Sequence, residues 1–414
     1  MNPFEKLGID EDFNPFYKEL DIKTPTLVQK KVIPLLLADK SLVCRAQTGT
    51  GKTLSYALPL SEKIKLIEDE SGPMTDKSAP YLVVISPTKE LATQITKVFK
   101  SLAHHVKLRV RMLGSTSQKP NALKSFSYEV LVTTPTKLER GLKNKSISFK
   151  QLKALVFDEA DQLFDMGFMK DVNGILRHVE FSETNISFFT ATLSKQMELF
   201  FEEKFRKLKL EKVLLGEDKV QRKKVETFNI QARVSEKNTL LKAFLEKTAQ
   251  GRGIIFVNQK NQITELEKFL ESSLPKLKYR VLHGGLEAKQ RELNLKSFVN
   301  KKAQVLLASD VAARGIDVKD LEWVFNYGLP KTAIYYMHRV GRVGRAGKAG
   351  QVFNLITEYD SKLITLINQV IKEQSDVDLD MIESKMKKTS KQPKTAKTKT
   401  KRVKQTKRSK LYKK

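Results

Sequence analysis

A glycine-rich segment carries the side chains best suited to chemistry on a phosphate group. It reads Ala46-Gln47-Thr48-Gly49-Thr50-Gly51-Lys52-Thr53 and lies between an apolar run of strand length and a helical pattern. Glycines allow backbone N–H groups to turn inward around phosphate oxygens at the start of a helix. Lys52 would reach the β- and γ-phosphates of a nucleotide, and the Thr53 hydroxyl would be a Mg²⁺ ligand. The alternative is a chance glycine-rich turn, which the strand–loop–helix context disfavours.

An acidic segment, Asp158-Glu159-Ala160-Asp161, directly follows the apolar run at 154–157. Acidic residues at the carboxyl end of a parallel strand, in a chain with a phosphate loop, are placed to meet a metal. Asp158 would hold Mg²⁺ through water, and Glu159 would accept a proton from the attacking water. Taken alone, the tetrapeptide could equally be a solvated charge cluster that opens a helix, and the upstream phosphate loop favours the first interpretation.

Arginines spaced three apart, with glycines between them, occur in His338-Arg339-Val340-Gly341-Arg342-Val343-Gly344-Arg345. Glycine permits close backbone approach, and arginine offers a fixed fork for phosphate. Supplied from a facing domain, such a segment meets the requirement for an arginine finger. The alternative, a basic loop that binds a nucleic-acid backbone, stays open at this point.

The elements that would position these segments are apolar runs of strand length that alternate with helical patterns. Continuous rather than alternating apolar runs are typical of parallel sheets covered on both faces. We expect two tandem doubly wound α/β units at 1–215 and 226–374, joined by a charged linker at 216–225, with a ligand in the cleft between them. The predicted strands are 42–44, 82–85, 130–132, 154–157, 186–189, 253–257, 280–282, 305–308, 323–325 and 352–356.

Length and composition exclude several classes of protein. At about 150 residues per domain, 414 residues allow two or three domains. The single cysteine, Cys44, excludes a disulfide scaffold and a cysteine-based zinc site. No apolar run approaches the ~18–20 residues that cross a bilayer, and the N-terminus lacks a secretion-signal pattern. We therefore expect a soluble protein of a reducing compartment.

Basic residues outnumber acidic ones by 76 to 47, which gives a net charge of +29. Residues 384–414 contain thirteen lysines, two arginines and no acidic residue, leaving 61 basic against 47 acidic residues, a net charge of +14, in 1–383. Because no hydrophobic face can be drawn there, we expect the tail at 375–414 to be disordered when free. The charge favours a polyanionic partner, most simply nucleic acid. The tail would be an RNA tether, or alternatively only a solubilising or nuclear-targeting segment.

The motifs and their order resemble those of the DEAD-box RNA helicases, which are superfamily 2 ATPases, and the resemblance covers residues 4–360. It implies two RecA-like domains, ATP as the nucleotide, Mg²⁺ as the metal and RNA as the partner. Pro25-Thr26-Leu27-Val28-Gln29 is similar to the family's Q motif, in which the Gln29 amide would pair with N6 and N7 of adenine. Phe4 matches the family aromatic that stacks on the base, with a core position as the alternative.

Further motifs of the family fall on residues that would couple the two domains to the nucleotide. Thr190-Ala191-Thr192 corresponds to the Ser-Ala-Thr that links hydrolysis to strand separation, and Asp161 and His338 belong to the same coupling set. The resemblance also assigns contacts with the ribose and the γ-phosphate to Asp317, Arg342 and Arg345.

A third set of positions would contact RNA, mostly through its backbone and 2′-hydroxyls, which predicts little sequence preference. The resemblance implies this role for Pro87, Thr88, Lys89, Gly114, Thr134, Pro135, Lys137, Gln290, Arg291, Arg314, Gly315 and Arg339. The chain departs from the family pattern at Asp21, Lys89, Ser115, Lys137 and Val343. Lysine in place of arginine keeps the charge but loses the bidentate fork, so two of these phosphate contacts would be weaker.

The resemblance implies an ATP-dependent RNA helicase that hydrolyses ATP to ADP and phosphate. Such an enzyme would open short duplexes or remodel RNA–protein complexes as its two domains close. Ribosome assembly or RNA decay in the cytoplasm is the expected setting, or the nucleus or nucleolus in a eukaryote. An RNA clamp with slow turnover and a DNA-directed helicase are the alternatives.

Overall fold

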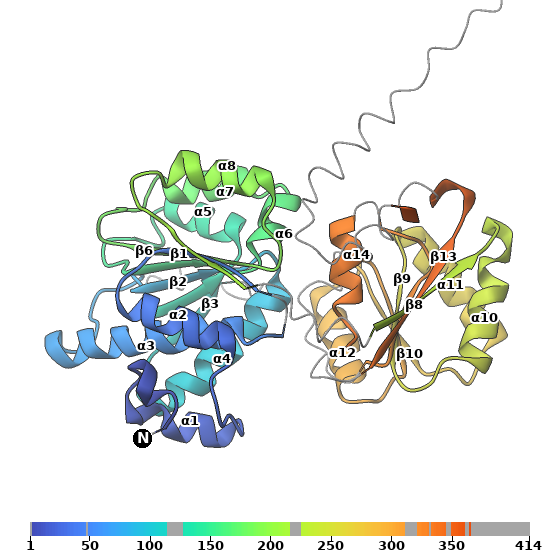
Figure 1. Ribbon diagram of the computed structural model, residues 1–414, viewed down its shortest axis with the longest axis horizontal. Coiled ribbons are helices and arrows are strands. Elements are labelled where there is room, and N and C mark those ends of the chain that lie inside the picture. The colour runs from blue at the N-terminus through green and yellow to red at the C-terminus, as the bar shows by residue number, and fades with distance from the viewer. Residues whose placement is uncertain are drawn as a thin grey trace, which may run out of the picture.

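Two parallel β-sheets, each flanked by helices, form the described part of the chain (Figure 1). The computed structural model describes residues 2–46, 49–113, 127–215, 225–310, 321–330, 333–344, 349–360 and 364–365. The strand pairings within both sheets are parallel. This confirms the predicted α/β class with two tandem sheet units. The predicted linker, apart from residue 225, and the predicted tail lie outside the described residues.

The first sheet has seven strands in the order β3-β4-β2-β5-β6-β1-β7. Its strands are β1 Leu42–Arg45, β2 Leu82–Ile85, β3 Val110–Leu113, β4 Val130–Thr133, β5 Ala154–Phe157, β6 Asn185–Thr190 and β7 Glu211–Leu214. Its helices are α1 Asn14–Glu19, α2 Leu27–Leu37, α3 Lys52–Ser71, α4 Lys89–Val106, α5 Pro135–Lys143, α6 Ala160–Asp165, α7 Met169–Leu176 and α8 Lys195–Lys204.

Helices cover the first sheet on both faces because its strands are apolar on both faces. Val84 of β2 belongs to the core beneath α2, α3 and α4, whereas the neighbouring Val83 and Ile85 belong to the core beneath α5 to α8. In α4, the side chains of Ile95, Phe99, Leu102 and Val106 are buried at helical spacing. Successive side chains of a strand point to opposite faces, so each buried strand contributes to two cores.

The second sheet has six strands in the order β10-β11-β9-β12-β13-β8. Its strands are β8 Val225–Gln231, β9 Gly253–Phe256, β10 Tyr279–Leu282, β11 Val305–Ala308, β12 Trp323–Asn326 and β13 Gly350–Ile356. Its helices are α10 Lys237–Lys247, α11 Lys260–Ser273, α12 Ala288–Val299 and α14 Ala333–Val340. Short 3₁₀ helices occur at Glu5–Leu7, Glu11–Phe13, Val234–Glu236 and Glu358–Asp360.

Three strands that the sequence analysis did not predict lie at sheet edges. β3 and β7 are the two edges of the first sheet, and β8 is one edge of the second. In β7 only Val213 is buried, and in β8 no residue is buried. These three edge strands lack the continuous apolar run on which the prediction rested, whereas the fourth edge strand, β10, was predicted from Val281 and Leu282. β8 also begins at residue 225, inside the predicted linker.

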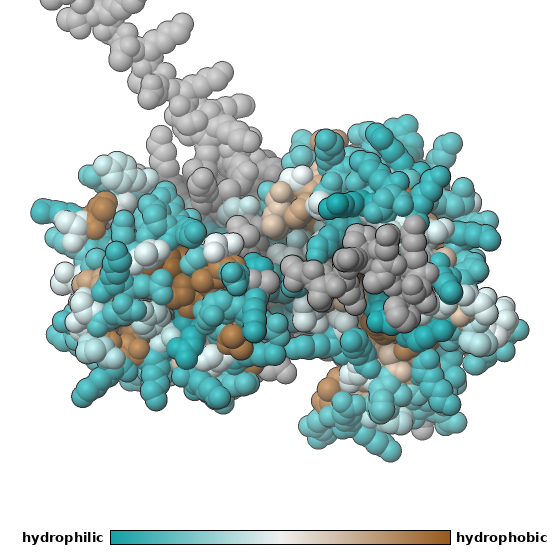
Figure 2. All heavy atoms as spheres, turned by 180° about the vertical axis from the view of Figure 1, so that it is seen from behind, coloured by the Kyte–Doolittle hydropathy of each residue, from teal (hydrophilic) through white to brown (hydrophobic). Residues whose placement is uncertain are grey.

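Polar side chains cover most of the face shown in Figure 2, with apolar side chains gathered in small patches. Among the described residues, no helix combines the length and apolar character needed to cross a membrane.

Because the strands of each sheet run in the same direction, their carboxyl ends share one rim, where ligands of doubly wound folds bind. In the first sheet this rim carries the phosphate loop after β1, the acidic segment after β5 and Thr190-Ala191-Thr192 at the end of β6.

Candidate nucleotide-binding site

The phosphate loop leads from β1 into α3 through glycines in the left-handed backbone region. Gly49 has φ +82° with open space where a side chain would begin, and Gly51 has φ +90° and caps α3. A Cβ on Gly51 would lie 2.6 Å from Nε2 of Gln29, so only glycine fits there. Lys52 is 6% exposed and its Nζ donates to the carbonyl of Ala46 at 2.6 Å. The described part of the loop suits phosphate binding, while Gln47 and Thr48 lie outside the described residues.

Gln29 ties the start of α2 to this loop. Its Oε1 accepts from the backbone N–H of Thr26 at 2.8 Å, and its Nε2 donates to the carbonyl of Gly51 at 3.2 Å. With the Thr26 hydroxyl accepting from the N–H of Gln29, these residues form a capping box. The Thr-x-x-Gln spacing is a sequence signal for this cap that the sequence analysis did not use. The pairing of Gln29 with adenine stays a prediction.

Phe4 lies in the core, which supports the packing alternative. Its ring is 0% exposed and stacks on Tyr17 with a centroid separation of 4.2 Å. Stacking on a base would require one face of this ring to be uncovered, so this structure does not support that role.

The acidic segment places two buried carboxylates side by side after β5. Asp158 is 3% exposed, and burial followed by the negative charge of Glu159 raises its pKa to about 6. The positive charge of Lys52 acts in the opposite direction on this pKa, which shows that the phosphate loop and the carboxylate are neighbours. Glu159 has φ +50° and its Oε2 accepts from Nε2 of Gln162 at 2.8 Å.

A tyrosine that the sequence analysis passed over reaches Asp158 from α3. The Tyr56 hydroxyl donates to Oδ2 of Asp158 at 2.9 Å, and the backbone N–H of Glu159 donates to Oδ1 at 2.9 Å. Burial and the charge of Asp158 raise the pKa of Tyr56 well above its ordinary value, so the hydroxyl keeps its proton. In the sequence, Tyr56 belongs to an apolar helical pattern, and only its spacing of four from Lys52 places it on the side of the helix that faces the loop.

The donor set fits Mg²⁺. The Thr53 hydroxyl and the Asp158 carboxylate would supply oxygen ligands, which this metal prefers. Among the described residues there is no group of three or more His, Cys, Asp or Glu side chains that could hold a metal ion. Mg²⁺ at nucleotide sites takes one or two carboxylates together with water and substrate phosphates, so a site with a single carboxylate and a hydroxyl suits it.

The predicted coupling residues meet at one carboxylate. Oδ2 of Asp161 accepts from the backbone N–H and the hydroxyl of Thr192, at 3.0 and 2.9 Å. The Thr190 hydroxyl donates to the carbonyl of Thr192 at 2.6 Å and accepts from the N–H of Asp161 at 3.3 Å. From the second unit, Nε2 of His338 lies 3.9 Å from the same Asp161 oxygen. The structure therefore brings together all four residues of the predicted coupling set.

Arg342 follows α14, and its side chain is turned back on that helix. It is 6% exposed, and its Nε donates to the carbonyl of His338 at 3.2 Å. Its predicted contact with a γ-phosphate stays a prediction. Several predicted ligands lie outside the described residues, namely Gly114, Arg314, Gly315, Asp317 and Arg345.

Arg339, predicted to contact RNA, is 1% exposed in this structure, and its RNA contact stays a prediction. All five of its N–H donors are used inside the second unit. Nε and Nη2 donate to the two carboxylate oxygens of Asp310 at 2.5 and 2.7 Å. The remaining donors bind Asn326 Oδ1, the Gly328 carbonyl and Asn258 Oδ1 at 2.8, 2.6 and 2.9 Å. Arg339 holds together loops at the carboxyl rim of the second sheet.

Two lysines predicted to contact RNA lie close to each other at the rim of the first sheet. Burial, followed by the positive charge of Lys89, lowers the pKa of Lys137. Lys89 begins α4 after the cap Thr88, whose hydroxyl accepts from the N–H of Leu91 at 3.2 Å. Pro135, after Thr134, begins α5. Two neighbouring like charges favour an anion between them.

Two of the remaining predicted RNA contacts, Gln290 and Arg291, lie on α12. Nη2 of Arg291 lies 3.2 Å from Oε1 of Glu90 on α4, which joins the two units by an ion pair that the sequence analysis did not predict. Nε2 of Gln290 donates to Oδ1 of Asn294 at 2.9 Å. The third, Pro87, lies in the segment between β2 and α4 and is buried.

Comparisons with known proteins agree with this arrangement. Residues 26–200 match the family described as DEAD/DEAH box helicase, and residues 236–347 match the helicase conserved C-terminal domain. The chain is 32% identical to the probable ATP-dependent RNA helicase MJ0669 of Methanocaldococcus jannaschii, over 89% of this chain and 96% of that protein. It is 30% identical to the DEAD-box ATP-dependent RNA helicase RhpA of Helicobacter pylori, over 91% of this chain and 72% of that protein.

A solved structure shares the fold. Dbp5 of S. cerevisiae, bound to RNA and ADP BeF3, superposes with a TM-score of 0.76 at 22% identity, over 94% of this chain and 99% of that one. The assignment to a family rests on two matched domains and on relatives that align over most of their length. The geometry of the phosphate loop and the acidic segment agrees with it. The chain belongs to the DEAD/DEAH box helicase family.

Proposed function

We propose that this chain is an ATP-dependent RNA helicase that opens short duplexes or remodels RNA–protein complexes. The observation that carries the proposal is the position of the Asp161 carboxylate. It accepts two hydrogen bonds from Thr192 and lies 3.9 Å from His338 of the second unit. Asp161 lies three residues after Asp158, the candidate metal ligand. Its carboxylate thus contacts both halves of the molecule. Events at the nucleotide can therefore alter how the two units meet.

The residues around the phosphate loop divide the work of ATP hydrolysis. Lys52, at the start of α3, would balance the negative charge of the phosphates, and Arg342 would add a second cation from the other unit. Glu159 would position the attacking water and accept its proton. Thr53 and Asp158 would hold Mg²⁺, which supplies further positive charge at the phosphates when bound.

RNA would bind across the rims of both units. The repulsion between Lys89 and Lys137 would be relieved by an RNA phosphate, which explains why two cations are kept close together. Such contacts are made with the phosphates of the RNA backbone rather than with the bases, so we expect weak sequence preference. Ribosome assembly and RNA decay, in the cytoplasm, are the processes we propose for such an activity, because both require short duplexes of varied sequence to be opened.

Closure of the two units would couple the two ligands. The contacts of Glu90 with Arg291 and of Asp161 with His338 join the units, and we propose that they form when ATP and RNA are both bound. Water is then excluded from the nucleotide, and the site is complete only in the closed state. Release of phosphate would reopen the cleft.

Replacing Lys52 by alanine tests the assignment of the nucleotide site. We expect Lys52→Ala to abolish RNA-stimulated ATP hydrolysis, because the phosphates lose the cation at the loop. The control is Lys65→Ala on the same helix, whose side chain contacts Asp12 and Asp69 at the surface. The control should hydrolyse ATP like the unchanged protein. Normal RNA-stimulated hydrolysis in Lys52→Ala would overturn the assignment.

Matched RNA and DNA oligonucleotides separate the proposed activity from its alternatives. An RNA helicase should hydrolyse ATP and separate a short duplex when RNA is present, with little stimulation by DNA. Tight RNA binding with neither turnover nor unwinding would identify a clamp, and equal stimulation by DNA would identify a DNA-directed enzyme.

A further inference from the structure

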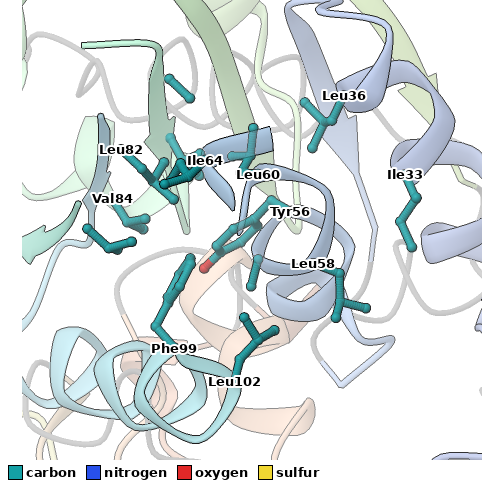
Figure 3. Close-up of a cluster of buried hydrophobic side chains, with 14 of the residues drawn as sticks. Ile33, Leu36, Tyr56, Leu58, Leu60, Ile64, Leu82, Val84, Phe99 and Leu102 are labelled. Carbon is teal, nitrogen blue, oxygen red and sulfur yellow. The ribbon is translucent and has the colours of Figure 1, made fainter. Parts of the chain in front are cut away.

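The Tyr56 hydroxyl is a polar group at the end of an otherwise apolar side chain in the core of the first unit. The side chain is 0% exposed, and its ring packs 4.8 Å from that of Phe189 and 6.2 Å from that of Phe99. Figure 3 shows the ring among the apolar side chains of α3 and α4, close to Phe99. A phenylalanine ring could make the same contacts, so packing alone does not account for the hydroxyl.

The hydroxyl stands between the two side chains that would hold Mg²⁺. It donates to Oδ2 of Asp158 at 2.9 Å, and the Thr53 side chain, three residues earlier on α3, lies within reach of it. Thr53 and Tyr56 lie in the first two turns of α3, whereas Asp158 follows β5. One buried oxygen therefore links the helix that begins at the phosphate loop to the strand end that carries the carboxylate.

Asp158 is held at both of its oxygens. Its Oδ1 accepts from the backbone N–H of Glu159 at 2.9 Å, and Tyr56 occupies the other oxygen. A carboxylate that is bonded on both sides has one orientation, and such partners of metal ligands orient them and strengthen metal binding. A buried hydroxyl is costly unless it is hydrogen-bonded, so its place beside this carboxylate stabilises both groups.

We propose that Tyr56 is a positioning residue of the Mg²⁺ site, whose hydroxyl fixes the Asp158 carboxylate in the orientation that receives the metal beside Thr53. This inference rests on the proposed function, in which Asp158 and Thr53 hold the metal. The role belongs to a single oxygen atom, and Tyr56→Phe removes that atom while keeping the ring.

The test measures how much Mg²⁺ is needed for nucleotide binding. A fluorescent ADP is titrated onto the full chain at a series of Mg²⁺ concentrations, without RNA and without turnover. In Tyr56→Phe we expect the Mg²⁺ concentration for half-maximal binding to rise about tenfold, the lower end of the effect of losing a partner of a metal ligand. Binding of the same ADP in the absence of Mg²⁺ should not change. An unchanged Mg²⁺ requirement in Tyr56→Phe would overturn the proposal.

Tyr128→Phe is the matched control. Tyr128 is also 0% exposed and lies just before β4, at the rim of the sheet opposite the nucleotide site. Losing its hydroxyl should leave the Mg²⁺ requirement as it was. Thermal unfolding of both variants shows whether they fold. A raised Mg²⁺ requirement in Tyr128→Phe would show that any lost buried hydroxyl has this effect and would overturn the proposal.

Asp158→Asn distinguishes failure of this inference from failure of the proposed metal site. We expect Asp158→Asn to raise the Mg²⁺ requirement, and Tyr56→Phe to add nothing in that background, because the two side chains act as one unit. If the effect of Tyr56→Phe persists in full beside Asp158→Asn, the hydroxyl acts elsewhere and the inference is wrong. If Asp158→Asn leaves the requirement unchanged, the metal site itself is wrong and the inference falls with it.

Discussion

The guanidinium group of Arg339 shows how a residue in a ligand-binding motif can serve the fold instead. Its fork binds both oxygens of Asp310, and its other donors bind Asn258, Asn326 and Gly328. The spacing of Arg339, Arg342 and Arg345 in the sequence gives no means of telling which arginine faces inward. That distinction depends on Asp310, which lies 29 positions away in the chain.

We expect Arg339→Lys to destabilise the second unit by about 3 kcal/mol, because lysine keeps the charge but cannot replace the planar fork or the remaining buried bonds. Thermal and urea unfolding, followed by tryptophan fluorescence from Trp323 in the same sheet, would measure the loss.

The control for this change is Arg280→Lys. Arg280 is exposed, and its Nη1 donates to the carbonyl of the neighbouring Tyr279 at 2.8 Å. Its replacement should leave the unfolding midpoint unchanged. An Arg339→Lys variant that unfolds like the unchanged protein, and instead loses RNA affinity, would favour the predicted RNA contact.

Helices α4 and α12, one from each unit, are joined by an ion pair. Glu90 and Arg291 are about one-quarter exposed and lie 3.2 Å apart across the two units. Arg291 was predicted to bind RNA, so its side chain has two candidate partners. Exchanging the charges decides between them, because a reversed pair can rebuild an ion pair but cannot rebuild an RNA contact.

We expect Arg291→Glu to lower RNA-stimulated ATP hydrolysis about fivefold, a change of about 1 kcal/mol, which is typical of a partly exposed ion pair. Adding Glu90→Arg should recover most of that loss. The matched control is the exchange of Lys242 and Glu246, an exposed pair within α10, which should have no effect. If the double exchange is as slow as Arg291→Glu alone, Arg291 acts on RNA and not on Glu90.

The central strands could be predicted from the sequence, as could the edge strand β10, whereas three other edge strands could not. All ten predicted strands occur, because a strand buried on both faces must be apolar at consecutive positions, as in β5 and β11. β3, β7 and β8 were missed because one side of each faces solvent. In β8 the apolar residues Val225, Phe228 and Ile230 are separated by polar ones, a mixed pattern that the search for continuous runs excludes.

The same limit applies to the candidate site. The phosphate loop, the acidic segment and the coupling residues are local motifs, so their positions on the rim follow from the order of the strands. The hydroxyl of Tyr56 and the carboxylate of Asp158 are 102 positions apart, and no local pattern connects them. The burial of Phe4 is likewise a property of the packed chain, since Tyr17, which covers its ring, could equally have faced solvent.

Charge is the property that belongs to the whole molecule. Of the net charge of +29, residues 1–383 carry +14, and the rest lies in 384–414. Each cation that neutralises an RNA phosphate releases a counterion. The slope of RNA affinity against salt concentration therefore increases with the number of phosphate contacts.

We expect removal of residues 384–414 to flatten the dependence of RNA affinity on salt while leaving ATP hydrolysis largely intact, because the nucleotide site lies entirely outside this segment. RNA affinity measured at several salt concentrations would show the change. A variant of full length, with the lysines and arginines of 384–414 replaced by glutamine, separates charge from chain length and should behave like the truncated protein. An unchanged slope in both variants would leave the segment without a role in RNA binding.

The common direction of the strands determines where labels can be attached to this molecule. The loops that enter the strands, such as the one that holds Tyr128 before β4, lie at the far rim of the sheet from the catalytic groups. Dyes attached there, one on each unit, would report the separation of the two units in real time while lying away from the candidate nucleotide site and the predicted RNA contacts at the other rim. The rim of each sheet at which the strands begin is thus suited to labels and insertions, because the candidate site lies at the rim at which the strands end.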